Sequence, residues 1–306
     1  MAKAPCARVG GVTLLCALTG CLVDPVPPWE LLGDAQRQPG HGQGKTGSVN
    51  IDIAPASLIS DAGASDTVDP GIDGPSADGA PAPAGTIVPL YTYPTHSSWN
   101  TLREAKQAHP AVSIIAVANV SSGPGAAKDP AYATGIRMLA SAGVTVVGYT
   151  HTSYGGRTSA LVKAEMEAWK TWYPEVQGIF FDQQASQPGH ESYYKDLSSH
   201  AASLGMHLTV GNPGTDVAES YVGTVDTMLI YDDVGLPSLA SLQGWHLAHE
   251  SARFGIIPYA VPALDLGFVA QARSFVGYIY VTDDTPENPW DSLPSYFAGL
   301  VAGLDA

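Results

Sequence analysis

From residue 85 to the C-terminus, short runs of apolar residues alternate with longer segments in which apolar side chains recur every three or four positions. The short runs are rich in β-branched and aromatic residues and are mostly bounded by Gly, Pro, Asn or Asp, a pattern that predicts β-strands. We expect eight strands, at 87–93, 112–120, 144–150, 176–182, 206–211, 227–232, 255–261 and 276–282.

The segments between these runs carry the start and stop signals of helices. Asp129 offers an N-cap, Pro130 suits the first helical position, and Gly143 stands where such a helix would end. The stretch 237–253 is less regular. Apolar residues keep to one helical face in three segments: Tyr132, Ile136 and Leu139; Val162, Met166, Trp169 and Tyr173; and Tyr194, Leu197, Ala201 and Leu204, followed by Gly205.

Eight strands that alternate with helices over about 220 residues predict an α/β fold with a parallel sheet. A closed (β/α)8 TIM-like barrel is the commonest form of that size, and a doubly wound open sheet is the alternative. A barrel places its chemistry in the loops at the C-terminal ends of the strands. Those ends are polar or aromatic, which suits a sugar ligand because hydroxyls need hydrogen-bond partners and sugar rings stack on aromatic faces.

Two carboxylic acids stand at such strand ends. Asp182 ends the run "GIFFD", and Asp232 ends the sixth predicted strand. Glycoside hydrolysis needs a pair of carboxyl groups that flank the scissile bond, so Asp182 and Asp232 are the candidate catalytic residues. Asp233 competes with Asp232, because consecutive strand residues point in opposite directions. An Asp directly after a strand also serves as a turn or helix-cap residue, which is the structural alternative for each acid.

Composition and charge exclude several classes of function. The chain has 306 residues, 45% of them hydrophobic, and a formal net charge of −15 from 14 Lys and Arg against 29 Asp and Glu. It therefore lacks the basic stripe that nucleic-acid binding requires. No His or Cys spacing indicates a zinc site, and no G-x-S-x-G elbow indicates a serine hydrolase of that class. We expect no cofactor, no metal and no nucleic-acid partner.

The first 20 residues have the layout of an export signal. Lys3 and Arg8 precede an apolar run that is too short to span a bilayer. The run ends in "LTGC", which resembles the lipobox of bacterial lipoproteins and implies lipidation of Cys21 after cleavage. An ordinary signal peptide followed by a chance cysteine is the alternative.

Residues 21–84 are rich in Pro, Gly, Ala, Ser and Asp and have no sustained helical period, a composition typical of flexible tethers. We therefore divide the chain into a signal peptide (1–20), a lipidated Cys21 with a tether (21–84) and a barrel domain (85–306). We expect a monomer in the cell envelope, at the outer membrane or cell surface, that meets the membrane only through its lipid anchor.

Five motifs, in order, resemble those of the spherulin 4-like proteins, also called spherulation-specific family 4. They are "SSGPG" from Ser121, "GYTHTSYGGR" from Gly148, "GIFFDQ" from Gly178, "GNPGT" from Gly211 and "GYIYVTDDTPENPWDSLPSYF" from Gly277. The resemblance implies a (β/α) barrel with its site at the ends of the fourth and sixth strands. It also implies an endo-acting glycoside hydrolase, since characterised fungal relatives cut α-1,4-linked N-acetylgalactosamine in the exopolysaccharide galactosaminogalactan.

The sequence departs from the family at two site positions. Gln183 replaces the second acid of an Asp-Glu pair, and Asp232 takes the place of a Glu, so the resemblance leaves two hypotheses. One is a surface-anchored glycoside hydrolase that uses Asp182 and Asp232, and the other is a non-catalytic polysaccharide-binding lipoprotein on the same scaffold. The residues expected to bind substrate are Gln183, Tyr91, Asn119, Tyr149, His151, Tyr154, Asn212, Asp283 and Trp290.

Overall fold

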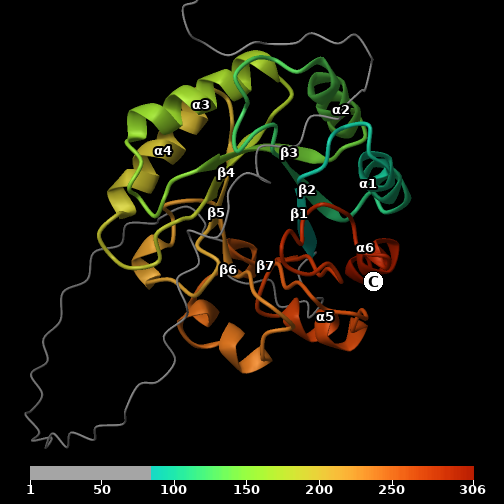
Figure 1. Cartoon of the computed structure of the whole chain (residues 1–306). Helices are drawn as coiled ribbons and strands as arrows, with labels where there is room; N and C mark the ends of the chain where they lie inside the picture. Colours follow the sequence, from blue (N-terminus) through green and yellow to red (C-terminus); the bar gives the residue numbers. More distant parts are fainter. Residues whose placement is uncertain (1–83) are drawn as a thin grey trace, which may run out of the picture. The chain divides into compact units, whose positions relative to one another are not determined.

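Eight parallel strands close into a barrel in the computed structural model, which describes residues 84–306 (Figure 1). Each strand pairs with the next one along the chain, and β1 pairs with β8 to close the ring. The predicted barrel is therefore confirmed and the open sheet is excluded. The strands are β1 Gly85–Leu90, β2 Ser113–Ala118, β3 Thr145–His151, β4 Gly178–Asp182, β5 Leu208–Asn212, β6 Thr227–Tyr231, β7 Phe254–Ile256 and β8 Tyr278–Ile279.

Helices surround the ring of strands in Figure 1. The connection between β6 and β7, where the sequence pattern is irregular, forms short 3-10 turns instead of an α-helix. In the part of the chain that the structure describes, no helix has both the length and the apolar character needed to cross a membrane. The helices are α1 Ser97–Ala108, α2 Pro130–Ser141, α3 Ser159–Trp172, α4 Glu191–Ser203, α5 Leu266–Ala272 and α6 Phe297–Leu304, with 3-10 helices η2 Glu219–Tyr221, η3 Leu239–Leu242, η4 Gly244–Ala248 and η5 Ser251–Arg253.

The sequence signals of α2 act as predicted. The Asp129 carboxylate accepts hydrogen bonds from the N–H groups of Ala131 and Tyr132, at 2.7 and 3.2 Å, which satisfies two of the otherwise unpaired donors of the first turn. At the other end, Gly143 follows the C-cap with φ of 89°, in the left-handed region that glycine adopts without steric cost.

Side chains of β4 alternate between the barrel interior and the helix layer. Phe180 stacks on Tyr149 of the neighbouring strand, with ring centroids 6.1 Å apart. Phe181 points the other way and meets Tyr194 of α4, with centroids 6.3 Å apart. Since residues i and i+2 of a strand share a face, Asp182 lies on the same face as Phe180, the interior of the barrel.

A close approach of α3 to β3 fixes the helix layer on this side. A Cβ on Gly148 would lie 2.5 Å from the indole of Trp169, so only glycine allows the contact. The indole N–H donates to the carbonyl of Tyr149 at 2.8 Å. Trp169 is fully buried, which confirms the expectation that it packs in the core.

Two predicted strands are too long. We expected β7 to cover 255–261 and β8 to cover 276–282, whereas the ladders cover three and two residues. Pro258 has no N–H to donate, and Ala260 has a left-handed φ of 54°, so the regular pairing cannot continue. Separate backbone hydrogen bonds still join the two segments, including Val261 N–H to Thr282 O at 3.0 Å.

Candidate active site

Two carboxylates and one amide meet at the C-terminal ends of three neighbouring strands. Asp182 is the last residue of β4, Asn212 is the last residue of β5, and Asp232 directly follows β6. The Asn212 Nδ2 group donates to Asp182 Oδ1 at 3.1 Å and to Asp232 Oδ2 at 3.0 Å. Because both oxygens bond the same nitrogen, they lie no more than about 6 Å apart. The structure thus brings the predicted pair together, with Asn212 between its members.

Asp182 is the more strongly hydrogen-bonded of the two acids. Tyr149 donates its phenol proton to Asp182 Oδ2 at 2.7 Å, and the main-chain N–H of Gln183 also donates to the carboxylate. Burial raises the pKa of Asp182 above its ordinary value, whereas the donors from Tyr149, Gln183 and Asn212 lower it. Hydrogen bonds to a carboxylate favour its charged form, so Asp182 is the better placed of the pair to be an anion.

Asp232 accepts fewer hydrogen bonds than Asp182 does. Burial raises the pKa of Asp232 from 3.8 to about 7, the negative charges of Asp182 and Asp233 add to the rise, and the amide of Asn212 opposes it. Asp233 is exposed, and its Oδ1 accepts the N–H of Val234 at 2.7 Å, which is a local turn contact. Of the two acids, Asp232 is the one that shares the Asn212 amide with Asp182.

An irregularity in β6 comes directly before Asp232. The register of β6 against β7 shifts between Leu229 and Tyr231. Such bulges re-aim side chains and are frequent beside active sites. Tyr231 turns its hydroxyl to the carbonyls of Val234 and Gly235, at 3.1 and 3.0 Å.

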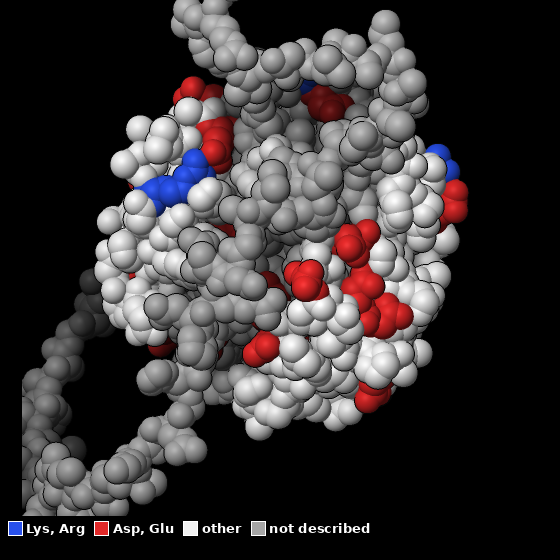
Figure 2. Space-filling view, in the orientation of Figure 1, with Lys and Arg blue, Asp and Glu red and all other residues white. Residues whose placement is uncertain are grey.

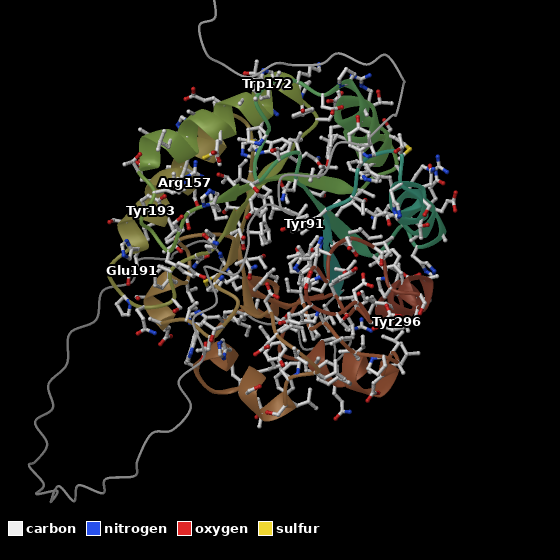
Figure 3. All side chains as sticks on the ribbon, viewed as in Figure 1. Tyr91, Arg157, Trp172, Glu191, Tyr193 and Tyr296 are labelled. Carbon is white, nitrogen blue, oxygen red and sulfur yellow. The ribbon has the colours of Figure 1, made fainter. Side chains whose placement is uncertain are left out.

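Two tyrosines flank the pair. Tyr91 meets Tyr149 edge to face, with ring centroids 5.7 Å apart, and lies inside the ring of strands in Figure 3. Tyr154, in the loop after β3, is 61% exposed. Burial and the charges of Asp182 and Asp232 raise the pKa of both phenols, so both remain protonated at neutral pH. Both phenols therefore lie close enough to the two acids to interact with them electrostatically.

Four other predicted residues make no hydrogen bond to the pair; three follow or end strands, and Trp290 lies in the segment between β8 and α6. Asn119 Oδ1 accepts the N–H of Gly123 at 3.1 Å, and Asp283 accepts a hydrogen bond from Ser295 at 2.8 Å. His151 Nδ1 lies 3.2 Å from Ser153 Oγ, and burial followed by the Arg157 charge lowers the pKa of this histidine. Trp290 packs on Tyr259 and Tyr280, and its carbonyl accepts the N–H of Tyr91 at 3.3 Å, which brings the C-terminal segment beside β1.

Gln183 contributes through its main chain. It has a left-handed φ of 51°, which is uncommon for a residue with a side chain, and its N–H supports Asp182. The other non-glycine residues with left-handed φ also lie in loops that follow strands. Residues with strained backbone are frequent at functional sites, where surrounding contacts hold the strained conformation in place. These residues are Ser122, Ser153, Tyr154, Gln183 and Ala260.

Sequence reasoning missed an ion pair behind the loop that follows β3. Arg157 makes a bidentate contact with Glu165 of α3, at 2.5 and 3.2 Å, and also donates to the carbonyl of His151 at 2.7 Å. Thr150 donates to the same carboxylate. The only sequence signal was the pairing of an Arg in the loop with a Glu on the inner face of the helix eight residues later.

The surface around the barrel is predominantly acidic where it carries charge. Figure 2 shows Asp and Glu side chains gathered near α6, with few Lys or Arg beside them.

Within residues 84–306, no three His, Cys, Asp or Glu side chains lie together in a way that could hold a metal ion.

Comparison with known proteins gives three findings. A family model described as Spherulation-specific family 4 matches residues 85–304. The chain is 31% identical over 238 residues to Spherulin-4 of Physarum polycephalum, an alignment that covers 73% of this chain and 71% of that protein. Its structure is similar to that of Aspergillus clavatus Sph3 in complex with GalNAc, with a TM-score of 0.65 and 25% identity, covering 74% of this chain and 99% of Sph3.

Proposed function

Since this chain belongs to spherulation-specific family 4, we propose that it is a glycoside hydrolase whose catalytic carboxyl groups are Asp182 and Asp232. The observation that carries the proposal is the pair itself, joined through Asn212 at the mouth of the barrel. Its substrate is a hexosamine-containing polysaccharide, similar to galactosaminogalactan, cut internally at α-1,4 linkages. The similarity to Sph3, whose structure holds GalNAc, supports a hexosamine ligand.

The surroundings of the two acids assign their roles. Burial raises the pKa of Asp232 to about 7, so about half of the molecules keep a proton there at neutral pH that can pass to a leaving oxygen, as a general acid must. Asp182 accepts hydrogen bonds from Tyr149, Asn212 and the Gln183 N–H, which stabilise its anion. The larger number of donors to Asp182 therefore assigns it the role of nucleophile and leaves Asp232 as the acid.

The spacing of the pair favours retention of anomeric configuration. Retaining glycosidases hold their carboxyl groups about 5 to 5.5 Å apart, and inverting ones about 6.5 to 9.5 Å, to leave room for water. The shared bond to Asn212 keeps the two bonded oxygens, the nearest atoms of the pair, within about 6 Å, which admits the retaining separation, and we propose retention on that basis.

The reaction then proceeds in two displacements. Asp182 attacks the anomeric carbon while Asp232 gives its proton to the departing glycosidic oxygen, which leaves a glycosyl ester on Asp182. Asp232, now ionised, takes a proton from a water whose oxygen attacks the same carbon. The ester breaks, Asp182 returns to its anion, Asp232 is protonated again, and a new reducing end is released.

Non-catalytic polysaccharide binding is the second candidate function, and the Gln183 substitution favours it. A glutamine cannot donate a proton as an acid or carry a negative charge, so a mechanism that needs an acid at position 183 would be lost. What supports the enzyme instead is that the pair assembles without the Gln183 side chain, because Gln183 supports Asp182 through its main-chain N–H.

Release of reducing ends by the wild type and by a Gln183→Glu variant separates the two candidates. The enzyme proposal predicts release from galactosaminogalactan by the wild type. No release by the wild type, together with release by Gln183→Glu and unchanged polysaccharide binding, would establish the wild type as a binding protein. Related hexosamine polymers, tested in parallel, define the substrate.

The N-terminal features lie outside the described residues. We propose that Cys21 is lipidated and that residues 21–84 tether the barrel to the cell envelope, as the lipobox-like sequence predicts. Metabolic labelling with a fatty acid, compared between the wild type and Cys21→Ser, tests the anchor: label that persists in the variant would overturn it.

A further inference from the structure

The turn that follows β4 connects Asp182 to the helix layer through a chain of buried hydroxyl groups. The N–H of Ala185 donates to the hydroxyl of Tyr194 on α4 at 2.9 Å. That hydroxyl lies 2.8 Å from Thr152 Oγ1, which lies 2.7 Å from the carbonyl of Gln183. Thr152 and Tyr194 are both fully buried, so no water competes for these contacts.

The hydroxyl protons in this series of hydrogen bonds can point in only one direction. The carbonyls of Gln183, at 2.7 Å, and Asp182, at 3.2 Å, can only accept, so Thr152 directs its single proton to them and must accept from Tyr194. Tyr194 already accepts from the Ala185 N–H, and donation to Thr152 uses its own proton. Every group in the sequence from Ala185 through Tyr194 and Thr152 to Gln183 is then satisfied, which is the condition for a buried polar network to be rigid.

The same loop holds Gln183 from a second side. The N–H of Tyr154 donates to the Gln183 carbonyl at 2.7 Å, and the N–H of Thr152 donates to the Asp182 carbonyl at 2.9 Å. Gln183 has a left-handed φ of 51°, a conformation in which the Cβ crowds the backbone and which surrounding contacts must therefore hold in place. Its N–H is the group that donates to the Asp182 carboxylate.

We propose that Thr152 and Tyr194 are positioning residues, which hold the left-handed turn at Gln183 so that its N–H stays aimed at the Asp182 carboxylate. This inference rests on the proposed function for its effect on turnover, although its structural content does not. The peptide unit that carries the Gln183 N–H has the Asp182 carbonyl as its oxygen, and Thr152 Oγ1 lies 3.2 Å from that carbonyl. Loss of the Thr152 hydroxyl, or of the Tyr194 hydroxyl that orients it, removes this contact and weakens the donation from the Gln183 N–H to the Asp182 carboxylate, which raises the pH at which that carboxyl ionises.

The chain offers a matched control beside Tyr194. Tyr193 lies on the same helix, its ring centroid is 5.0 Å from that of Tyr194, and its buried hydroxyl has no hydrogen-bond partner among residues 84–306. Figure 3 shows Tyr193 beside α4, away from Tyr91 inside the barrel. Tyr193→Phe removes the same atom as Tyr194→Phe, from the same layer, without touching the turn. Thr152→Ser keeps the hydroxyl that Thr152→Val removes.

Titration of the Asp182 carboxyl by carbon NMR tests the inference in the purified protein without substrate, with the resonance assigned by its loss in Asp182→Asn. We expect the midpoint to rise by about half to one pH unit in Tyr194→Phe and Thr152→Val and to stay at the wild-type value in Tyr193→Phe and Thr152→Ser. The other groups that face Asp182 are unchanged by these variants: Tyr91 after β1, Tyr149 and His151 on β3, Tyr154 after β3, Asn212 on β5 and Asp232 after β6.

Kinetics supply the second readout. With hexosamine polymer as substrate, the two disruptive variants should lose about tenfold in kcat with little change in KM, because the reacting carboxylate is displaced and binding surfaces are kept. An unshifted Asp182 midpoint in both Tyr194→Phe and Thr152→Val, each confirmed as folded by near-UV circular dichroism, would overturn the inference. If the wild type releases no reducing ends but the Asp182 midpoint still shifts in the two disruptive variants, the inference is upheld and only the proposed function is overturned.

Discussion

Replacing Asp232 with Asn removes a carboxyl group that folding places in a poorly solvated position, and the change should stabilise the protein above neutral pH. The pKa of Asp232 rises on folding from 3.8 to about 7. Below about pH 4 the group is protonated in both the folded and the unfolded chain, so it costs nothing. Between the two values the folded protein keeps a proton that the unfolded chain has released, and stability therefore falls as pH rises.

The size of the effect follows from that interval. Each pH unit between the two pKa values is worth about 1.4 kcal/mol, so complete ionisation of Asp232 at pH 8 costs up to about 4 kcal/mol. Asp232 is only half-buried and keeps some contact with solvent at the barrel mouth, which reduces the penalty. We expect Asp232→Asn to raise the free energy of unfolding by roughly 2 to 4 kcal/mol at pH 8 and by little at pH 4.

Urea unfolding of the wild type and the variant, followed by circular dichroism from pH 4 to pH 8, measures this difference. Asp233→Asn is the matched control, because Asp233 is exposed, its side chain makes a local turn contact, and its charge is the smallest of the contributions to the Asp232 pKa. A gain for Asp232→Asn that is the same at pH 4 and pH 8, or that Asp233→Asn reproduces, would refute the reasoning that burial drives the pKa of Asp232 upwards.

Three further predictions address the pair and the barrel. Because Asp232 must hold a proton to act as the acid, kcat/KM should fall as pH rises above about 7, and a rate that stays flat to pH 9 would contradict this role. Asn212→Ala removes the donor shared by the pair and should lower kcat by about 10²-fold, whereas Asn119→Ala, a substitution of the same type at another strand end, should leave kcat within a few-fold of wild type. Gly178→Ala would place a Cβ 2.1 Å from a backbone oxygen of β5 and should cost about 3 kcal/mol of unfolding free energy, whereas Gly299→Ala in α6, with its nearest atom at 3.5 Å, should cost nothing in the same urea titration.

Strand positions could be predicted from the sequence because barrel strands are buried on both faces. The run from Gly178 to Phe181 is apolar without alternation, and each such run marks a strand whichever way its side chains point. Strand ends were less predictable. The segments after Ile256 and Ile279 are as apolar as the others, but Pro258 and the left-handed Ala260 interrupt their ladders, and this depends on backbone angles that hydrophobicity does not encode.

The sequence placed the site residues at one end of the barrel and left their roles open. Asp182, Asn212 and Asp232 were all identified by their positions at strand ends, but the double donation from Asn212 requires three strands in register and could not be predicted from any one of them. The register shift in β6, directly before Asp232, also has no signal in the sequence.

The contribution of Tyr194 was hidden by its periodicity. The apolar period of α4 correctly predicts that the Tyr194 ring is buried, but it does not predict the hydrogen-bond partners of the hydroxyl. Its partners, the Ala185 N–H and Thr152, belong to two loops that are distant in sequence and adjacent only in the closed barrel. The left-handed turn at Gln183 gave no sequence signal, since glycine and asparagine are the residues expected in that conformation.

The central claim is that Asp182 and Asp232 together cleave a hexosamine polymer. Incubation of the wild type, Asp182→Asn, Asp232→Asn and Asp233→Asn with galactosaminogalactan, followed by measurement of new reducing ends, tests it most directly. The account predicts release by the wild type and Asp233→Asn, and a loss of at least about 10²-fold in each of the other two variants. Wild-type release that survives in Asp182→Asn would contradict it.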